Sequence, residues 1–225
     1  MDLHMHGVPL IEQVIEKVMK EGLGGFCGTP QLRTPVPLSA QAVADLRMPG
    51  GKPISPSLRR WLMFDASWLA EIGWYADPLA PVLEGNPLSI TADQMYGFGR
   101  SEHYWTEMFA EFEPLISGPC FPLVGGCDSR RLLYVGEPDS IGEYPVLVTD
   151  IDDMPYVAVM YPGLDVYLAH EAGVIDLDFD TYTSLIEHPI YGTRMQEHAT
   201  HTGLGPDGIE IQDLYTTDKG TITAP

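Results

Sequence analysis

The sequence predicts an α+β fold, in which helices pack on one face of a twisted antiparallel sheet. Apolar residues recur at three- and four-residue steps in the first part of the chain, which is typical of helices. After about residue 115 this period gives way to short β-branched and aromatic runs bounded by Gly, Pro and Asp. The runs follow one another at intervals of about 11 to 12 residues, which favours an antiparallel meander over βαβ units.

The expected helices lie mainly in the first part of the chain. Residues 10–19 place apolar side chains on one face and charged ones on the other. Ser39 is expected to cap a short helix, and Ser55 with Pro56 begins the clearest one, since proline at the first helical position loses no hydrogen bond. Asp65 falls on the apolar stripe of that helix, so we expect the helix to break there and Asp65 to cap another.

A further helix is expected over 103–115, before the sheet begins. The expected strands are 121–124, 132–135, 144–149 and 156–161. Residues 163–173 are expected to form a short helix laid on that sheet. Beyond Gly203 the sequence is rich in Gly, Thr and Asp, which predicts a loosely held tail.

Composition supports a folded chain. Of 225 residues, 44% are hydrophobic and 10% aromatic, more than a disordered acidic chain contains. Cys27, Cys120 and Cys127 lack a CxxC spacing, which argues against a disulfide framework or zinc knuckle and suits a reducing cytosol. The sequence starts without signal-peptide features and has no apolar run approaching about 18 residues. We therefore expect a cytoplasmic protein that does not enter a membrane.

The charge is strongly negative and unevenly distributed. The formal net charge is −20. Residues 1–100 carry 8 basic and 10 acidic residues, or −2, whereas residues 101–225 carry 4 and 22, or −18. Such a chain repels phosphate, which excludes nucleic acid and anionic membranes as favoured partners and leaves basic proteins and metal cations.

Two segments resemble metal sites. Asp2, His4 and His6 have the D-x-H-x-H spacing of barrel-fold hydrolases, but no strand precedes them to hold the ligands, so we interpret the match as chance. Residues 176–187 match five ligand positions of a calcium loop, with Thr181 where the sharp turn requires glycine. The matching residues are Asp176, Asp178, Asp180, Ser184 and Glu187. We interpret this stretch as an acidic surface segment, with a divalent-cation site as the alternative.

Two other polar groups allow chemistry without requiring it. Glu143, Asp150, Asp152 and Asp153 bracket the third expected strand, where they fit hairpin turns better than an acid–base pair or a metal site. His188, His198, His201 and Glu197 could ligate zinc, but Thr200, Thr202 and Gly203 argue against the helix that would align them. No nucleophile elbow, Walker A loop or dinucleotide-binding turn is present, so we expect neither an enzyme nor a cofactor.

Three stretches resemble the SUKH superfamily. Residues 53–65, PISPSLRRWLMFD, resemble its helix opening, and residues 142–153, GEYPVLVTDIDD, resemble its strand with a Pro-Val step and an acidic turn. Residues 156–168, YVAVMYPGLDVYL, look like its last strand running into a helix. The resemblance covers about 39–172, which implies a SUKH-like α+β domain there. Residues 1–38 would then be a helix and Pro/Gly loop extension, and 173–225 an acidic carboxy-terminal extension.

The resemblance implies a binding function, because bacterial members of that family are commonly immunity proteins that neutralise a toxin and others are regulatory binding modules. No catalytic residue carries over. The leading hypothesis is therefore an immunity protein that binds a basic cognate toxin; a scaffold module without a toxin, a metal-dependent hydrolase and a calcium-binding protein are the alternatives. The expected partner-binding residues are Glu143, Asp150, Asp152, Asp153, Asp165, Asp176, Asp178 and Asp180.

Overall fold

The structure is a computed structural model that describes residues 5–21, 35–48, 51–67, 69, 120–123, 129–150 and 156–210. The helix expected over 103–115 and the acidic residues Asp152 and Asp153 lie outside the described residues. Within the described part, no helix is long and apolar enough to cross a membrane.

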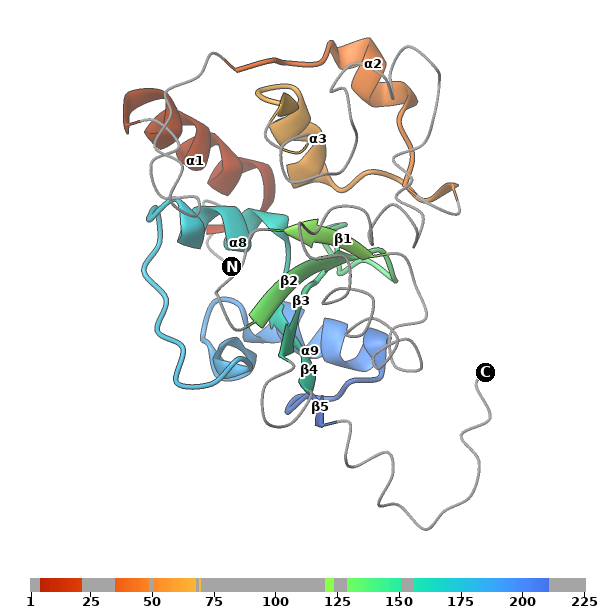
Figure 1. The fold of residues 1–225 in the computed structure, drawn as a ribbon, viewed down its shortest axis with the longest axis vertical. Coiled ribbons are helices and arrows are strands. Elements are labelled where there is room, and N and C mark those ends of the chain that lie inside the picture. Colours follow the sequence, from red (N-terminus) through yellow and green to blue (C-terminus); the bar gives the residue numbers. More distant parts are fainter. Residues whose placement is uncertain are drawn as a thin grey trace.

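A five-stranded sheet forms the centre of the fold (Figure 1), and each pair of neighbouring strands is antiparallel. The strands are β1 (Cys120–Leu123), β2 (Ser129–Tyr134), β3 (Val146–Asp150), β4 (Tyr156–Tyr161) and β5 (Ile209–Glu210). Their order across the sheet is their order in the sequence. The predicted α+β class and the meander of the first four strands are therefore confirmed.

Helices surround this sheet. They are α1 (Gly7–Glu21), α2 (Ala40–Asp45), α3 (Pro56–Leu62), α8 (Leu164–Glu171), the 3-10 helix η3 (Ser184–Glu187) and α9 (Gly192–Thr202). Figure 1 shows α1, α2 and α3 together at one end of the molecule, with α8 between α1 and the sheet. Helix α9 packs against η3 and β4.

The helix starts follow from local sequence. The Ser39 hydroxyl accepts a hydrogen bond from Ala42 N at 3.1 Å, and the Ser55 hydroxyl accepts one from Leu58 N at 3.4 Å. Both serines are therefore the N-caps that the sequence predicts. Asp65 is buried and accepts hydrogen bonds from Val36 N and Ser67 N, so it satisfies backbone donors where α3 has ended.

The sheet is covered on both faces. Val146, Leu147 and Val148 point alternately to opposite faces, yet each is at most 1% exposed. Val157 to Tyr161 of β4 are buried as well, each at most 4% exposed. Coverage therefore extends beyond the single face that the sequence led us to expect, which explains why these strands read as continuous apolar runs.

The described parts of the two expected extensions belong to this core. Leu10 and Val14 of α1 and Leu185 and Met195 from the carboxy-terminal part join the same hydrophobic cluster as the strands. Residues 204–210 are not a loose tail either, because β5 pairs with β4. The described parts of 1–38 and 173–225 therefore share one hydrophobic core with the residues between them, and the domain boundaries at 38 and 173 stay a prediction.

Helix α9 forms although its threonines argued against it. The hydroxyls of Thr200 and Thr202 donate hydrogen bonds to the carbonyl oxygens of Gln196 and His198, at 2.9 and 2.8 Å, which keeps both side chains compatible with a helix. Gly203 follows in the left-handed conformation with a φ of 73°, the usual stop for a helix.

Truncation of Met195 tests whether α9 is part of the core. Met195→Ala removes a fully buried side chain, so we expect a loss of roughly 2–5 kcal/mol in the free energy of unfolding. Met19→Ala is the matched control, because Met19 is 64% exposed on α1 and its truncation should change stability by less than about 0.5 kcal/mol. Chemical denaturation followed by circular dichroism measures both, and equal effects would show that α9 is not packed as described.

Candidate functional site

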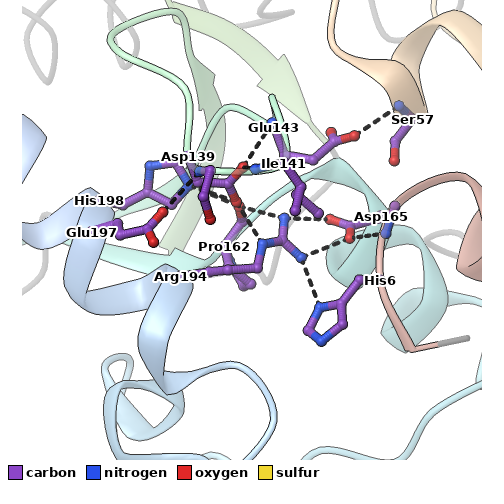
Figure 2. Close-up of polar contacts among 12 residues, drawn as sticks. His6, Ser57, Asp139, Ile141, Glu143, Pro162, Asp165, Arg194, Glu197 and His198 are labelled. Atoms are coloured by element: carbon purple, nitrogen blue, oxygen red, sulfur yellow. Dashed lines mark hydrogen bonds and ion pairs between the residues drawn. The ribbon is translucent and has the colours of Figure 1, made fainter. Parts of the chain in front are cut away.

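Arg194 lies at the centre of a buried cluster of charged side chains (Figure 2). It belongs to α9, and its side chain is 0% exposed. Its Nε is 2.5 Å from Asp139 Oδ2, and its Nη1 is 2.8 Å from Asp165 Oδ2. Its Nη2 donates hydrogen bonds to Pro162 O at 3.0 Å and to Asp165 Oδ1 at 3.2 Å. One guanidinium thus joins the loop before β3, the end of β4 and helix α8.

Both carboxylates that face Arg194 also accept backbone donors. Asp139 Oδ1 accepts from Ile141 N and Glu143 N at 3.0 and 2.9 Å, and Asp165 Oδ2 accepts from Gly7 N at 2.6 Å. Although burial acts to raise it, the hydrogen bond with His198 and the positive charge of Arg194 lower the pKa of Asp139 to about 2. Asp139 is therefore ionised at neutral pH, as its ion pair requires.

Two histidines complete the polar surroundings of Arg194. His6 Nδ1 lies 3.3 Å from Arg194 Nη1, and because the guanidinium can only donate, Nδ1 is assigned as the acceptor. Burial, followed by the positive charge of Arg194, lowers the pKa of His6. His198 Nε2 lies 2.9 Å from Pro162 O and 3.4 Å from Asp139 Oδ2.

Glu143 is the carboxyl group of the cluster that lacks an ion pair with Arg194. It is fully buried, and its Oε1 accepts a hydrogen bond from Ser57 N, near the start of α3, at 2.8 Å. Its Oε2 has no hydrogen-bond partner among the described residues. Burial, with the negative charge of Asp165 as the next cause, raises the pKa of Glu143 to about 8.

The tight packing of this cluster explains why residue 163 is a glycine. A Cβ at Gly163 would lie 2.7 Å from Arg194 Nη2 and 2.9 Å from Glu143 Cβ. The backbone of Gly163 is extended, with a φ of 174°, so the constraint is one of space and not of conformation. The last residue before α8 therefore has no room for a side chain beside the ion pairs.

The structure separates the eight acidic residues that the sequence grouped as partner contacts. Glu143 and Asp165 are 0% exposed, so no partner can contact them on the folded surface, and the expectation is wrong for both. Each satisfies internal backbone donors instead. Asp150 is half-buried and accepts a hydrogen bond from the Tyr182 hydroxyl at 2.6 Å. The remaining described residues of the set are exposed; they are Asp176, Asp178 and Asp180.

The exposed aspartates alternate with anchored side chains between α8 and η3. Leu177 is buried, and the ring of Phe179 packs against the rings of Tyr161 and His170, with centroids 5.4 Å away from each. Tyr182 lies under Arg131, whose guanidinium carbon is 5.7 Å from the ring centroid. The segment 176–182 is therefore held against the sheet while its carboxylates point outward.

Neither the calcium-like loop nor the histidines considered for zinc form a metal site in the described part of the chain, and Asp2 and His4 lie outside it. No group of three or more His, Cys, Asp or Glu there is arranged to hold a metal ion, and this part includes the whole calcium-like loop and the three histidines considered for zinc. In the loop, Thr181 N instead donates a hydrogen bond to Ser184 Oγ at 3.0 Å. His198, one of the three histidines, is buried beside Arg194 in the charge cluster.

Sequence reasoning missed Arg194, Asp139 and His6 as a group. One signal was available: Arg194 is the single Lys or Arg between Asp165 and Glu210, in a helix of otherwise uncharged or acidic residues and histidines. A lone arginine among so many acids is a candidate for a buried partner of two carboxylates. Its partners cannot be named from spacing, because Asp139 lies 55 residues away and His6 lies 188 residues away.

Comparisons with known proteins bear on the fold alone. No family model matches the chain, and no curated protein matches it. A solved structure is similar to it: an uncharacterized protein from Salmonella enterica subsp. enterica serovar typhimurium str. 14028s, with a TM-score of 0.53 and 17% sequence identity. The match covers 89% of this chain and 93% of the other. It supports an α+β fold that extends over most of the chain, and membership of the SUKH superfamily stays a prediction.

Replacement of Arg194 tests the role of the cluster in stability. Arg194→Met leaves Asp139 and Asp165 buried without their cation, so we expect a loss of about 3–5 kcal/mol in the free energy of unfolding. Arg60→Met is the matched control, because Arg60 pairs with Glu12 at the surface and should contribute about 0–1 kcal/mol. Urea denaturation compares them, and a loss no larger than that of the control would contradict the structural role of Arg194.

Proposed function

We propose that this protein acts by binding, as an immunity protein that neutralises a basic cognate toxin. The supporting observation is the charge of segment 171–210. It contains 8 acidic residues and one basic residue, Arg194, counting Lys and Arg. Because the Arg194 side chain is fully buried in an ion-pair cluster, no Lys or Arg of this segment is available to offset its exposed acids.

The exposed carboxylates are held in fixed positions, which suits recognition of a preformed partner. Phe179 and Tyr182 anchor the segment to the sheet, so Asp176, Asp178 and Asp180 need little further ordering when a partner binds. Alternate residues of an extended segment are roughly 6.5–7 Å apart. A row of lysines or arginines on a partner could pair with carboxylates at such intervals.

A negative face also explains how such a protein would act quickly. Opposite charge steers two proteins together and raises the association rate by about 10- to 1,000-fold, an effect that salt suppresses. A toxin that acts on nucleic acid carries a basic cleft, because its substrate is a polyanion. An acidic face of this kind would compete for that cleft. We propose this mode of action without assigning a catalytic residue or a cofactor to the chain.

A regulatory or scaffold module with a basic partner other than a toxin would use the same face. Gene neighbourhood and toxicity separate these two functions, since an immunity gene lies beside the gene of the toxin that it neutralises. No observation on the described residues favours the hydrolase or the calcium-binding protein.

Co-purification tests the proposal. The tagged chain is expected to form a complex with the protein encoded by the adjacent gene at low salt, and to abolish the toxicity of that protein when both are expressed. Neutralising the row with Asp176→Asn, Asp178→Asn and Asp180→Asn should weaken the complex at least tenfold and reduce the dependence of its dissociation constant on salt.

The matched control removes an equal amount of charge elsewhere. Glu16→Gln, Glu21→Gln and Asp45→Asn neutralise three exposed acids on α1 and α2, and this variant should bind as the unaltered chain does. Equal weakening by both sets would mean that overall charge, and not this face, carries the interaction. Absence of a complex at low salt would refute the immunity function.

A further inference from the structure

The buried cluster contains more carboxyl groups than cations. Arg194 faces Asp139 and Asp165, and each of these two makes an ion pair with it. Glu143 is equally buried but makes no ion pair among the described residues: its Oε1 accepts a hydrogen bond from Ser57 N, and its Oε2 has no hydrogen-bond partner there. An ionised carboxylate without a cation is costly in such surroundings, and the usual outcome is that the group takes up a proton.

The other charged and titratable groups of the cluster come from every element that meets there. Asp139 lies on the same loop, Asp165 on α8, and Arg194 and His198 on α9, while His6 immediately precedes α1. Arg194 is the one Lys or Arg among these groups, and its single positive charge is already shared by Asp139 and Asp165 before Glu143 is counted. An ionised Glu143 would add a third buried carboxylate to one guanidinium.

Helix α3 contributes the Ser57 hydroxyl to the surroundings of Glu143. Ser57 Oγ is buried and, like Glu143 Oε2, has no hydrogen-bond partner among the described residues. Both atoms belong to the residue pair that the Ser57 N–Oε1 hydrogen bond already joins. A serine hydroxyl can accept from a carboxylic acid or donate to a carboxylate, and its donation acts to lower the pKa of Glu143 against the larger effect of burial.

We propose that Glu143 keeps a proton in the folded chain at neutral pH, and that loss of this proton in mildly alkaline solution loosens the contact between the 135–145 loop and the start of α3. The strength of this contact inside the fold then depends on pH. This contact is separate from the acidic face proposed to bind a partner, so evidence against its pH dependence would leave the proposed binding function unaffected.

The direction of the pH effect follows from proton binding. The pKa of Glu143 is raised above its ordinary value of 4.5, so between that value and about 8 the folded chain holds a proton that the unfolded chain has lost. The contribution of Glu143 to the free energy of unfolding is complete below its ordinary pKa of 4.5 and is lost as the pH rises towards about 8. While the two states differ by one proton, the unfolding equilibrium constant rises about tenfold per pH unit.

Other groups titrate too, so a variant must isolate Glu143. Asp139, whose pKa is lowered, changes the stability with pH only in acidic solution. Because the pKa values of His6 and His170 are lowered, these two histidines make the chain more stable as the pH rises towards their ordinary value of about 6.5, which is opposite to the effect of Glu143. Burial raises the pKa of Glu171, which lies outside the cluster, so Glu171 also lowers the stability as the pH rises, as Glu143 does. The difference between the unaltered chain and Glu143→Gln cancels these contributions.

The experiment is chemical denaturation from pH 6.5 to 9. Glu143→Gln resembles the protonated acid, so relative to this variant the unfolding constant of the unaltered chain should rise about tenfold per pH unit up to the folded-state pKa. Glu137→Gln is the control on the same loop, because its side chain is 72% exposed and pairs with Lys52, and it should keep the slope of the unaltered chain. An unchanged slope in Glu143→Gln would overturn the proposal.

A second measurement uses the unaltered chain and does not depend on how the variant folds. Nuclear magnetic resonance of the glutamate side-chain carboxyl carbons should show one glutamate that titrates above neutral pH, and the amide resonance of Ser57 should shift with the same midpoint. Titration of every glutamate in the ordinary acidic range, or a Ser57 amide that does not respond, would refute the proposal.

Discussion

The pairing of one guanidinium with two carboxylates organises much of the described structure. Arg194 is contributed by α9, Asp139 by the loop before β3 and Asp165 by α8, and Asp165 in turn accepts the backbone donor of Gly7 at the start of α1. Elements from both ends of the chain therefore meet at one set of directional contacts. Apolar packing supplies most of the driving force for folding, but it fixes position less strictly than hydrogen bonds with defined geometry do.

Two kinds of acidic residue emerge from a sequence in which all of them look alike. Some, such as Asp65 and Asp139, are buried and serve backbone donors that the irregular parts of the chain leave without partners. Others, such as Asp176 and Asp178, project from a segment that aromatic side chains hold in place. The net charge of the chain describes neither group, because it does not distinguish charge that solvent can reach from charge that is neutralised inside.

Features governed by neighbouring residues are predictable from this sequence, and those governed by distant residues are not. Ser39, Ser55 and Pro56 mark helix starts because capping involves groups only a few residues apart. The strands are recognisable because β-branched runs between turns have few alternatives. By contrast, Glu143 and Asp165 stand in stretches that read as a turn and a helix surface, and their burial depends on Arg194 and Ser57, which lie far along the chain.

The span of the His6–Arg194 contact has a consequence for synthesis of the protein. These residues are 188 positions apart, and the strands that lie between them pair with immediate sequence neighbours. The meander can therefore form while the chain is still emerging from the ribosome, whereas the contacts of Arg194 with His6, Asp139 and Asp165 must wait for α9 to be translated. Long-range closure of this kind raises contact order and slows the last step of folding. A nascent chain that stops before Arg194 would expose several carboxylates and apolar strand faces that the complete chain buries.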